Sequence, residues 1–118
     1  MIFENMDVWR RSRVLAIAVY REMAQLRDFG FKDQITRSAL SVPSNIAEGL
    51  ERSSNPDKCR FIEYAKGSVG ELRTQIDIGI EIGYVPRETG NIWIQECHEL
   101  ALMLAGLIKT LRVDKSSR

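Results

Sequence analysis

Residues 93–111, WIQECHELALMLAGLIKTL, decide the fold class. The apolar side chains of this stretch recur at alternating intervals of four and three residues, at Trp93, Cys97, Leu100, Leu104, Leu107 and Leu111. An α-helix places residues at this spacing on one face, and an apolar face continued over about five turns is typical of a seam between packed helices. The stretch therefore predicts a long amphipathic helix in a helical bundle.

The same spacing predicts three more helices, so that the expected helices cover residues 6–28, 32–51, 56–82 and 89–113. Gly30 is expected to stop the first helix. Asn55 is expected to cap the third, with Pro56 at its first position. Because short connections favour antiparallel neighbours, we expect a single all-α domain over residues 1–118, folded as an antiparallel up-and-down four-helix bundle.

Pro43, Gly67 and Gly70 lie in the interior of these predicted helices although their residue types are unfavourable for helix formation. Proline removes a backbone hydrogen bond and clashes with the preceding turn. The apolar spacing stays in phase across Pro43, so we expect one kinked second helix rather than two shorter ones. Each glycine costs about 1 kcal/mol relative to alanine, so we expect a neighbouring helix to press close to Gly67 and Gly70.

The net charge of the chain is only +1, so a strongly positive surface can arise only where basic residues cluster. Contact with nucleic acid would therefore depend on clusters of basic residues rather than on overall charge. The alternative is a solvated surface of ion-paired helices. The candidate phosphate-binding residues are Arg10, Arg11, Arg13, Arg37, Arg52, Lys58, Arg60, Lys66 and Arg73.

A polar stripe follows the second helix beside its apolar face, through Gln34, Ser38, Ser41, Asn45, Glu48 and Arg52. Such a stripe can bind a ligand, line a channel or meet another subunit. It can also hold two helices of one chain together by hydrogen bonds. We expect the last of these, a structural network made by Ser41, Asn45 and Glu48 with Glu71 of the third helix.

Residues for metal, cofactor or catalytic chemistry are scarce. Cys59 and Cys97 are far apart in the sequence, and His98 is the only histidine. Neighbouring residues of a helix point about 100° apart, so His98 cannot converge with Glu96 and Glu99 on one ion. We expect no metal, no cofactor and no enzyme activity. The absence of an export signal or a long apolar run predicts a cytoplasmic protein that does not enter the membrane.

The stretch SVPSNIAEG at residues 41–49 resembles the hallmark of the four-helix-bundle family also called the 23S ribosomal RNA intervening-sequence or S23-type proteins. The similarity continues through MDVW at 6–9, QITRSA at 34–39, RFI at 60–62, AKGS at 65–68 and GLI at 106–108. The resemblance implies a bacterial protein that forms homopentamers around a central channel. A related branch serves diversity-generating retroelements, together with a reverse transcriptase and nucleic acid. The resemblance implies no catalytic residues.

These observations favour a homo-oligomeric scaffold or nucleic-acid-binding protein that recognises RNA or a structured duplex by shape and charge. The alternative is a protein–protein interaction module for one partner, such as a reverse transcriptase, engaged through exposed apolar residues such as Trp93 or Phe3. Self-association is expected because several apolar residues of the last two helices lie off the main stripes. These are Ile62, Val69, Ile78, Ile80, Ile92, Ile94, Leu102, Met103 and Ile108.

Overall fold

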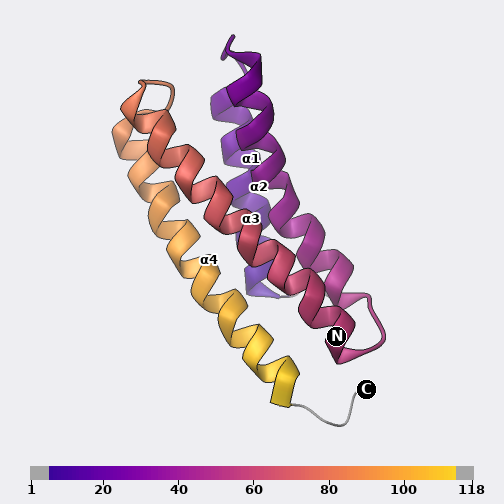
Figure 1. Cartoon of the computed structure of the whole chain (residues 1–118). Coiled ribbons are helices and arrows are strands. Elements are labelled where there is room, and N and C mark those ends of the chain that lie inside the picture. The colour runs from indigo at the N-terminus through magenta and orange to yellow at the C-terminus, as the bar shows by residue number, and fades with distance from the viewer. Residues whose placement is uncertain (1–5, 114–118) are drawn as a thin grey trace.

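The computed structural model describes residues 6–113, which form four α-helices and, within that range, no strand (Figure 1). The helices are α1 (Asp7–Met23), α2 (Phe29–Leu50), α3 (Asn55–Glu81) and α4 (Arg87–Val113). The prediction of an all-α bundle is confirmed. Within residues 6–113, no helix is long and apolar enough to cross a membrane.

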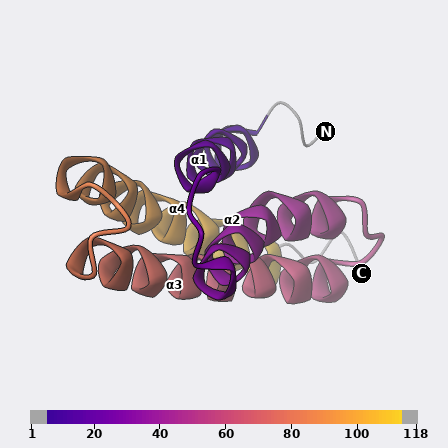
Figure 2. The same ribbon diagram turned by 90° about the horizontal axis from the view of Figure 1, so that it is seen from above.

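Successive helices run in opposite directions, and α4 returns to the side of α1 (Figures 1 and 2). The bundle measures 49 × 21 × 21 Å. α2 and α4 each pack along α3, whereas α1 meets α4 over a much shorter line. α1 has 17 residues and α4 has 27, so α1 is about 15 Å shorter. The bundle is therefore less closed between α1 and α4 than elsewhere.

The core takes apolar side chains from all four helices, and its central members are fully buried: Val19, Met23, Ile35, Ile46, Ile62, Leu72, Ile76, Leu100 and Leu104. Burial of one such side chain stabilises the fold by about 1.5–3 kcal/mol. In α4 the buried face continues from Leu104 to Ile108, while Leu107 and Leu111 are half-buried. The buried face drifts in this way because a straight helix does not keep a seven-residue repeat in phase.

The predicted boundary between the first two helices is wrong. α1 ends at Met23, and Gly30 is the second residue of α2 rather than a stop signal. The reason is the side chain of Asp28, whose Oδ1 accepts a hydrogen bond from the backbone N–H of Phe31 at 3.1 Å. This N-cap satisfies a backbone donor that the helix leaves free, so α2 begins earlier than the apolar spacing indicates.

The predicted cap of α3 is also wrong. Ser54 is the N-cap, because its Oγ accepts a hydrogen bond from the backbone N–H of Asp57 at 3.3 Å. Asn55 is the first helical residue and is buried. Its Nδ2 donates to the carbonyl oxygen of Leu111 at 3.0 Å, which ties the start of α3 to the last turn of α4.

α2 runs without interruption from Phe29 to Leu50 through Pro43, so the expectation of a single helix is confirmed. Pro43 is buried, and its neighbours Val42 and Ile46 both belong to the core. The free energy gained by burying these apolar side chains offsets the cost of the backbone hydrogen bond that proline removes. The kink at Pro43 stays a prediction.

The expected close packing on Gly67 and Gly70 is wrong for this chain. A Cβ atom added at either glycine would meet no heavy atom within 4 Å. The crowded glycines lie where successive helices meet: Gly49 at the end of α2, where a Cβ would lie 3.0 Å from Cβ of Phe61, and Gly79 and Gly90 on either side of the turn from α3 into α4. A Cβ at Gly90 would overlap the side chain of Ile80, and one at Gly79 would lie 2.9 Å from Cγ2 of Val85. The packing around this turn therefore leaves little room for a side chain at Gly79 or Gly90.

Several apolar residues expected at a subunit interface belong to the core instead: Ile62, Val69, Ile80 and Ile108. The reason is that α3 lies between α2 and α4, so a wide part of its surface is covered. Trp93 is also buried, which contradicts its expected role as an exposed partner contact, and Phe3 lies outside the described residues. The members that remain accessible are Ile78, Ile92 and Leu102, with Ile94 and Met103 half-buried.

Candidate nucleic-acid interface

Four of the candidate arginines form ion pairs with a carboxylate three or four residues away on the same helix or helix end. The pairs are Arg10 with Asp7, Arg37 with Asp33 (3.1 Å), Arg52 with Glu48 (2.7 Å) and Arg60 with Asp57 (3.2 Å). Exposed pairs of this kind contribute about 0–1 kcal/mol to stability. A paired guanidinium adds no net positive charge to the surface, so these arginines are weak candidates for binding phosphate.

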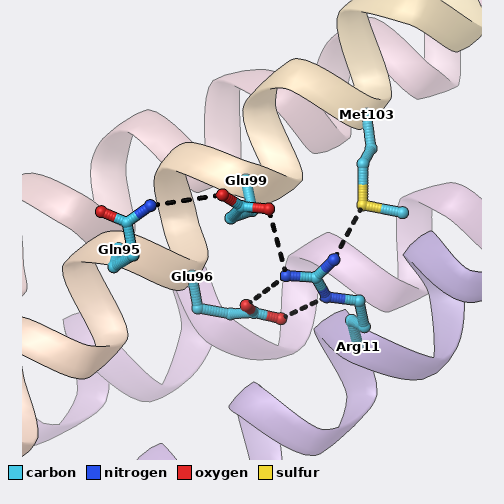
Figure 3. Close-up of polar contacts among 5 residues, drawn as sticks. All are labelled: Arg11, Gln95, Glu96, Glu99 and Met103. Atoms are coloured by element: carbon cyan, nitrogen blue, oxygen red, sulfur yellow. Dashed lines mark hydrogen bonds and ion pairs between the residues drawn. The ribbon is translucent and has the colours of Figure 1, made fainter.

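Arg11 joins α1 to α4 (Figure 3). Its Nε and Nη2 donate to the two carboxylate oxygens of Glu96 at 2.8 and 2.6 Å, and Nη2 lies 3.7 Å from Glu99. Nη1 points at the sulfur of Met103, 3.6 Å away. The hydrogen bonds to Glu96 raise the pKa of Arg11. This two-pronged contact fixes the guanidinium, so Arg11 holds two helices together rather than facing a ligand.

The remaining candidates form no ion pair with another residue of the range 6–113: Arg13, Lys58, Lys66 and Arg73. Two of them, Lys66 and Arg73, line one hollow of about 370 Å³ between α3 and α4. Its other lining residues are Glu63, Gly67, Val69, Gly70, Cys97, His98 and Ala101. We call this feature the α3/α4 hollow. It brings together Lys66 and Arg73, which are two of the predicted phosphate-binding residues, and His98, which the sequence raises only as a candidate metal ligand.

The charge of the α3/α4 hollow is positive. Glu63, the only carboxylate among its lining residues, already pairs with Arg112 at 3.0 Å. Among residues 6–113, no carboxylate lies within ion-pair distance of Lys66 or Arg73. Gly67 and Gly70 form part of the hollow and present no side chain, which lets a ligand approach the helix backbone closely.

The thiol at the α3/α4 hollow is not suited to nucleophilic chemistry. Cys97 is fully buried beneath it, and burial raises the pKa of its thiol to about 12. A thiol with so high a pKa stays protonated at neutral pH and is a poor nucleophile. Over residues 6–113, no three histidine, cysteine or acidic side chains gather where they could hold a metal ion. The hollow is suited to binding an anion.

The predicted polar network is only partly brought together. Asn45 Nδ2 donates to Oγ of Ser41 at 2.9 Å, and Ser41 Oγ lies 2.7 Å from Oγ of Ser68. This chain links α2 to α3 through Ser68, a residue absent from the prediction. Glu48 turns instead to Arg52, and Glu71 lies exposed at the rim of a polar hollow between α2 and α3.

The four helices and the core that they share define an all-α helical-bundle protein. The chain matches the 23S rRNA-intervening sequence protein family over residues 4–106. It therefore belongs to that family, and the resemblance drawn from residues 41–49 is confirmed.

The fold is also found in a solved structure. A protein of unknown function from the S23 ribosomal protein family of Bacteroides thetaiotaomicron shares 24% sequence identity with this chain and has a TM-score of 0.81. The match covers 86% of this chain and 98% of the other. No curated protein matches this chain. At this level of identity, the likeness establishes the bundle fold alone.

Proposed function

We propose that this chain is a non-enzymatic, homo-oligomeric protein that binds RNA or a structured duplex through the α3/α4 hollow. The nucleic-acid backbone would lie along the hollow, with its phosphates beside Lys66 and Arg73 and within reach of His98. The family description, which refers to 23S rRNA, supports a nucleic-acid ligand. The pentameric state is implied only by the family resemblance. The two free cysteines fit a reducing bacterial cytoplasm.

This proposal is supported by a difference between two groups of predicted basic residues: those that form an ion pair with a carboxylate and those that do not. Most arginines of the predicted set balance a carboxylate, whereas Lys66 and Arg73 lie on one hollow without such a partner. Phosphates attract such cations because binding releases the counterions condensed on the nucleic acid. Contacts of this kind position a backbone without reading its bases, so we expect little sequence preference.

The test is a salt titration with a fluorescently labelled RNA hairpin and the assembled protein. Lys66→Ala and Arg73→Ala should each weaken binding several-fold and reduce the slope of log affinity against log salt by about 0.9. Arg37→Ala is the matched control, because it also removes one exposed positive charge, but one that pairs with Asp33. An equal loss in all three variants would show that the hollow is not the site. An absence of binding at about 50 mM salt would end the proposal.

The alternative function is a protein–protein interaction module, for which the resemblance implies a partner such as a reverse transcriptase. The exposed apolar residues Ile92 and Leu102 favour it. Apolar contacts are insensitive to screening, so binding to such a partner would persist at high salt, where contacts to phosphate are lost. A pull-down from the native host, washed at low and at high salt, separates the two functions.

A further inference from the structure

α1 is apolar on all sides over part of its length. Residues 14–20, VLAIAVY, are an unbroken apolar run that fills about two helical turns. Leu15, Ala16 and Val19 face the core and are buried. Val14 and Tyr20 point elsewhere and are 62% and 44% exposed. A helix that is apolar all round is normally covered on every side, so α1 has more apolar surface than its own bundle buries.

One side of this run borders the short seam with α4. A hollow of about 630 Å³ lies there between the two helices, lined on α1 by Val14 and Ala18 and on α4 by Ile92, which is 65% exposed. We call it the α4 flank. Glu96 also lines it and, with Glu99, shares the single guanidinium of Arg11 (Figure 3). One negative charge is thus left unbalanced beside an apolar hollow.

The other side of α1 carries a second hollow, of about 470 Å³, against α2. We call it the α2 flank, and its lining residues are Arg13, Ala16, Ile17, Tyr20, Arg21, Leu40 and Pro43. Leu40 is 50% exposed. Neither Arg13 nor Arg21 makes an ion pair with any residue in the range 6–113. The α2 flank is therefore apolar like the α4 flank, but opposite to it in charge.

We propose that the α2 flank of one copy of this chain binds the α4 flank of the next, so that α1 is the centre of the contact between copies. This inference rests on the self-association proposed above and names its surface. A second copy fits better than a foreign protein because one chain carries both halves of a charge-complementary pair. Contact between two different surfaces is head-to-tail, and it produces a ring where the rotation closes and an open chain where it does not.

The experiment uses variants that block one flank each. Val14→Lys places a positive charge on the α4 flank, where it repels the arginines of the neighbour, and Leu40→Glu places a negative charge on the α2 flank. Both positions are exposed, so each chain should keep its helix content by circular dichroism. By light scattering at micromolar concentration, each variant alone should be a monomer. Ile82→Glu is the control, because Ile82 is exposed but lines neither flank, and it should keep the mass of the unchanged protein.

Mixing the two blocked variants gives the decisive result. Val14→Lys keeps an intact α2 flank and Leu40→Glu an intact α4 flank, so an equimolar mixture should form a 1:1 dimer that cannot grow further. A variant that keeps the mass of the unchanged oligomer would overturn the assigned surface and leave self-association standing. A dimer formed by either variant alone would also overturn it, because that contact would join identical surfaces. A monomeric unchanged protein would refute self-association itself and would mean that a different molecule covers α1.

Discussion

Glycine has different roles in the middle of α3 and around the turn from α3 into α4. Near the turn into α4, Gly79 and Gly90 lie where added Cβ atoms would meet Val85 and Ile80, so the packing of this chain excludes any larger residue. In the middle of α3, Gly67 and Gly70 have open space around them. The first pair is explained by the fold and the second is not. Gly67 and Gly70 both line the cationic α3/α4 hollow, where the absence of a side chain leaves the helix backbone accessible.

The largest expected effect is at the crowded end. In Gly90→Ala the new methyl group would overlap Cγ1 and Cδ1 of Ile80 and lie 3.2 Å from Cγ1 of Val85. Overpacking of a filled core typically costs about 1–3 kcal/mol, which exceeds the gain of about 1 kcal/mol that alanine brings to a helix. Urea unfolding should therefore show a net loss of stability. A variant as stable as the unchanged protein would mean that the side chains around Gly90 can move to accept a methyl group. Gly90 would then not differ from Gly67 in its packing.

An alanine in the middle of α3 should change the free energy of unfolding in the opposite direction. Gly67→Ala adds a methyl group that meets nothing within 4 Å, so the gain in helix propensity is uncompensated. We expect the free energy of unfolding to rise by up to about 1 kcal/mol. Gly90→Ala, measured in the same denaturant series, is the matched comparison. A loss of stability in Gly67→Ala would show that another molecule, such as a second copy, presses on this face in solution.

Local periodicity was sufficient to predict the four helices but not their ends. The spacing of apolar residues reports the main buried face of each helix, but it assigns Ile62, Val69, Ile80 and Ile108 to a subunit interface although they lie in the core. Helix ends depend on single side chains, and Asp28 and Ser54 act as caps through one hydrogen bond each. Asn55 was the more obvious cap by residue type, but its side chain is used to hold the end of α4. Such competition is tertiary and cannot be seen in a linear sequence.

Some contacts of the candidate site could likewise be predicted from the sequence, and others could not. Four of the ion pairs join residues three or four apart, as in Arg37 with Asp33, and this helical spacing is visible in the sequence. The sequence alone therefore indicates that these arginines are paired. The contact of Arg11 with Glu96 spans 85 positions and becomes evident only when α1 and α4 are placed side by side. The same is true of the α3/α4 hollow, which brings His98 beside Lys66 and Arg73.

The smallest expected effect concerns the polar contact at the crowded end. Tyr84 follows α3 and donates from its hydroxyl to Oδ2 of Asp28 at 2.7 Å, while its ring lies edge-on to Phe31 at 5.2 Å. The hydrogen bond from Tyr84, and then the one from the backbone N–H of Phe31, lower the pKa of Asp28. A carboxyl group with a lowered pKa in the folded state contributes stability above its unfolded pKa of about 3.9 and loses it as the pH falls through the folded value.

Tyr84→Phe removes the larger cause of that shift and keeps the ring against Phe31. The variant should be slightly less stable than the unchanged protein at pH 7, and the difference should shrink as the pH falls from about 3.9 through the lower folded pKa of Asp28, below which Asp28 is protonated in both states. Urea unfolding at neutral and acidic pH measures it, and a difference that stays constant with pH would show that the hydrogen bond to Asp28 contributes nothing. Because Asp28 is exposed, its contribution must be smaller than that of the packing around Gly90. The crowded end of the bundle is therefore held by close packing first and by its polar contact second.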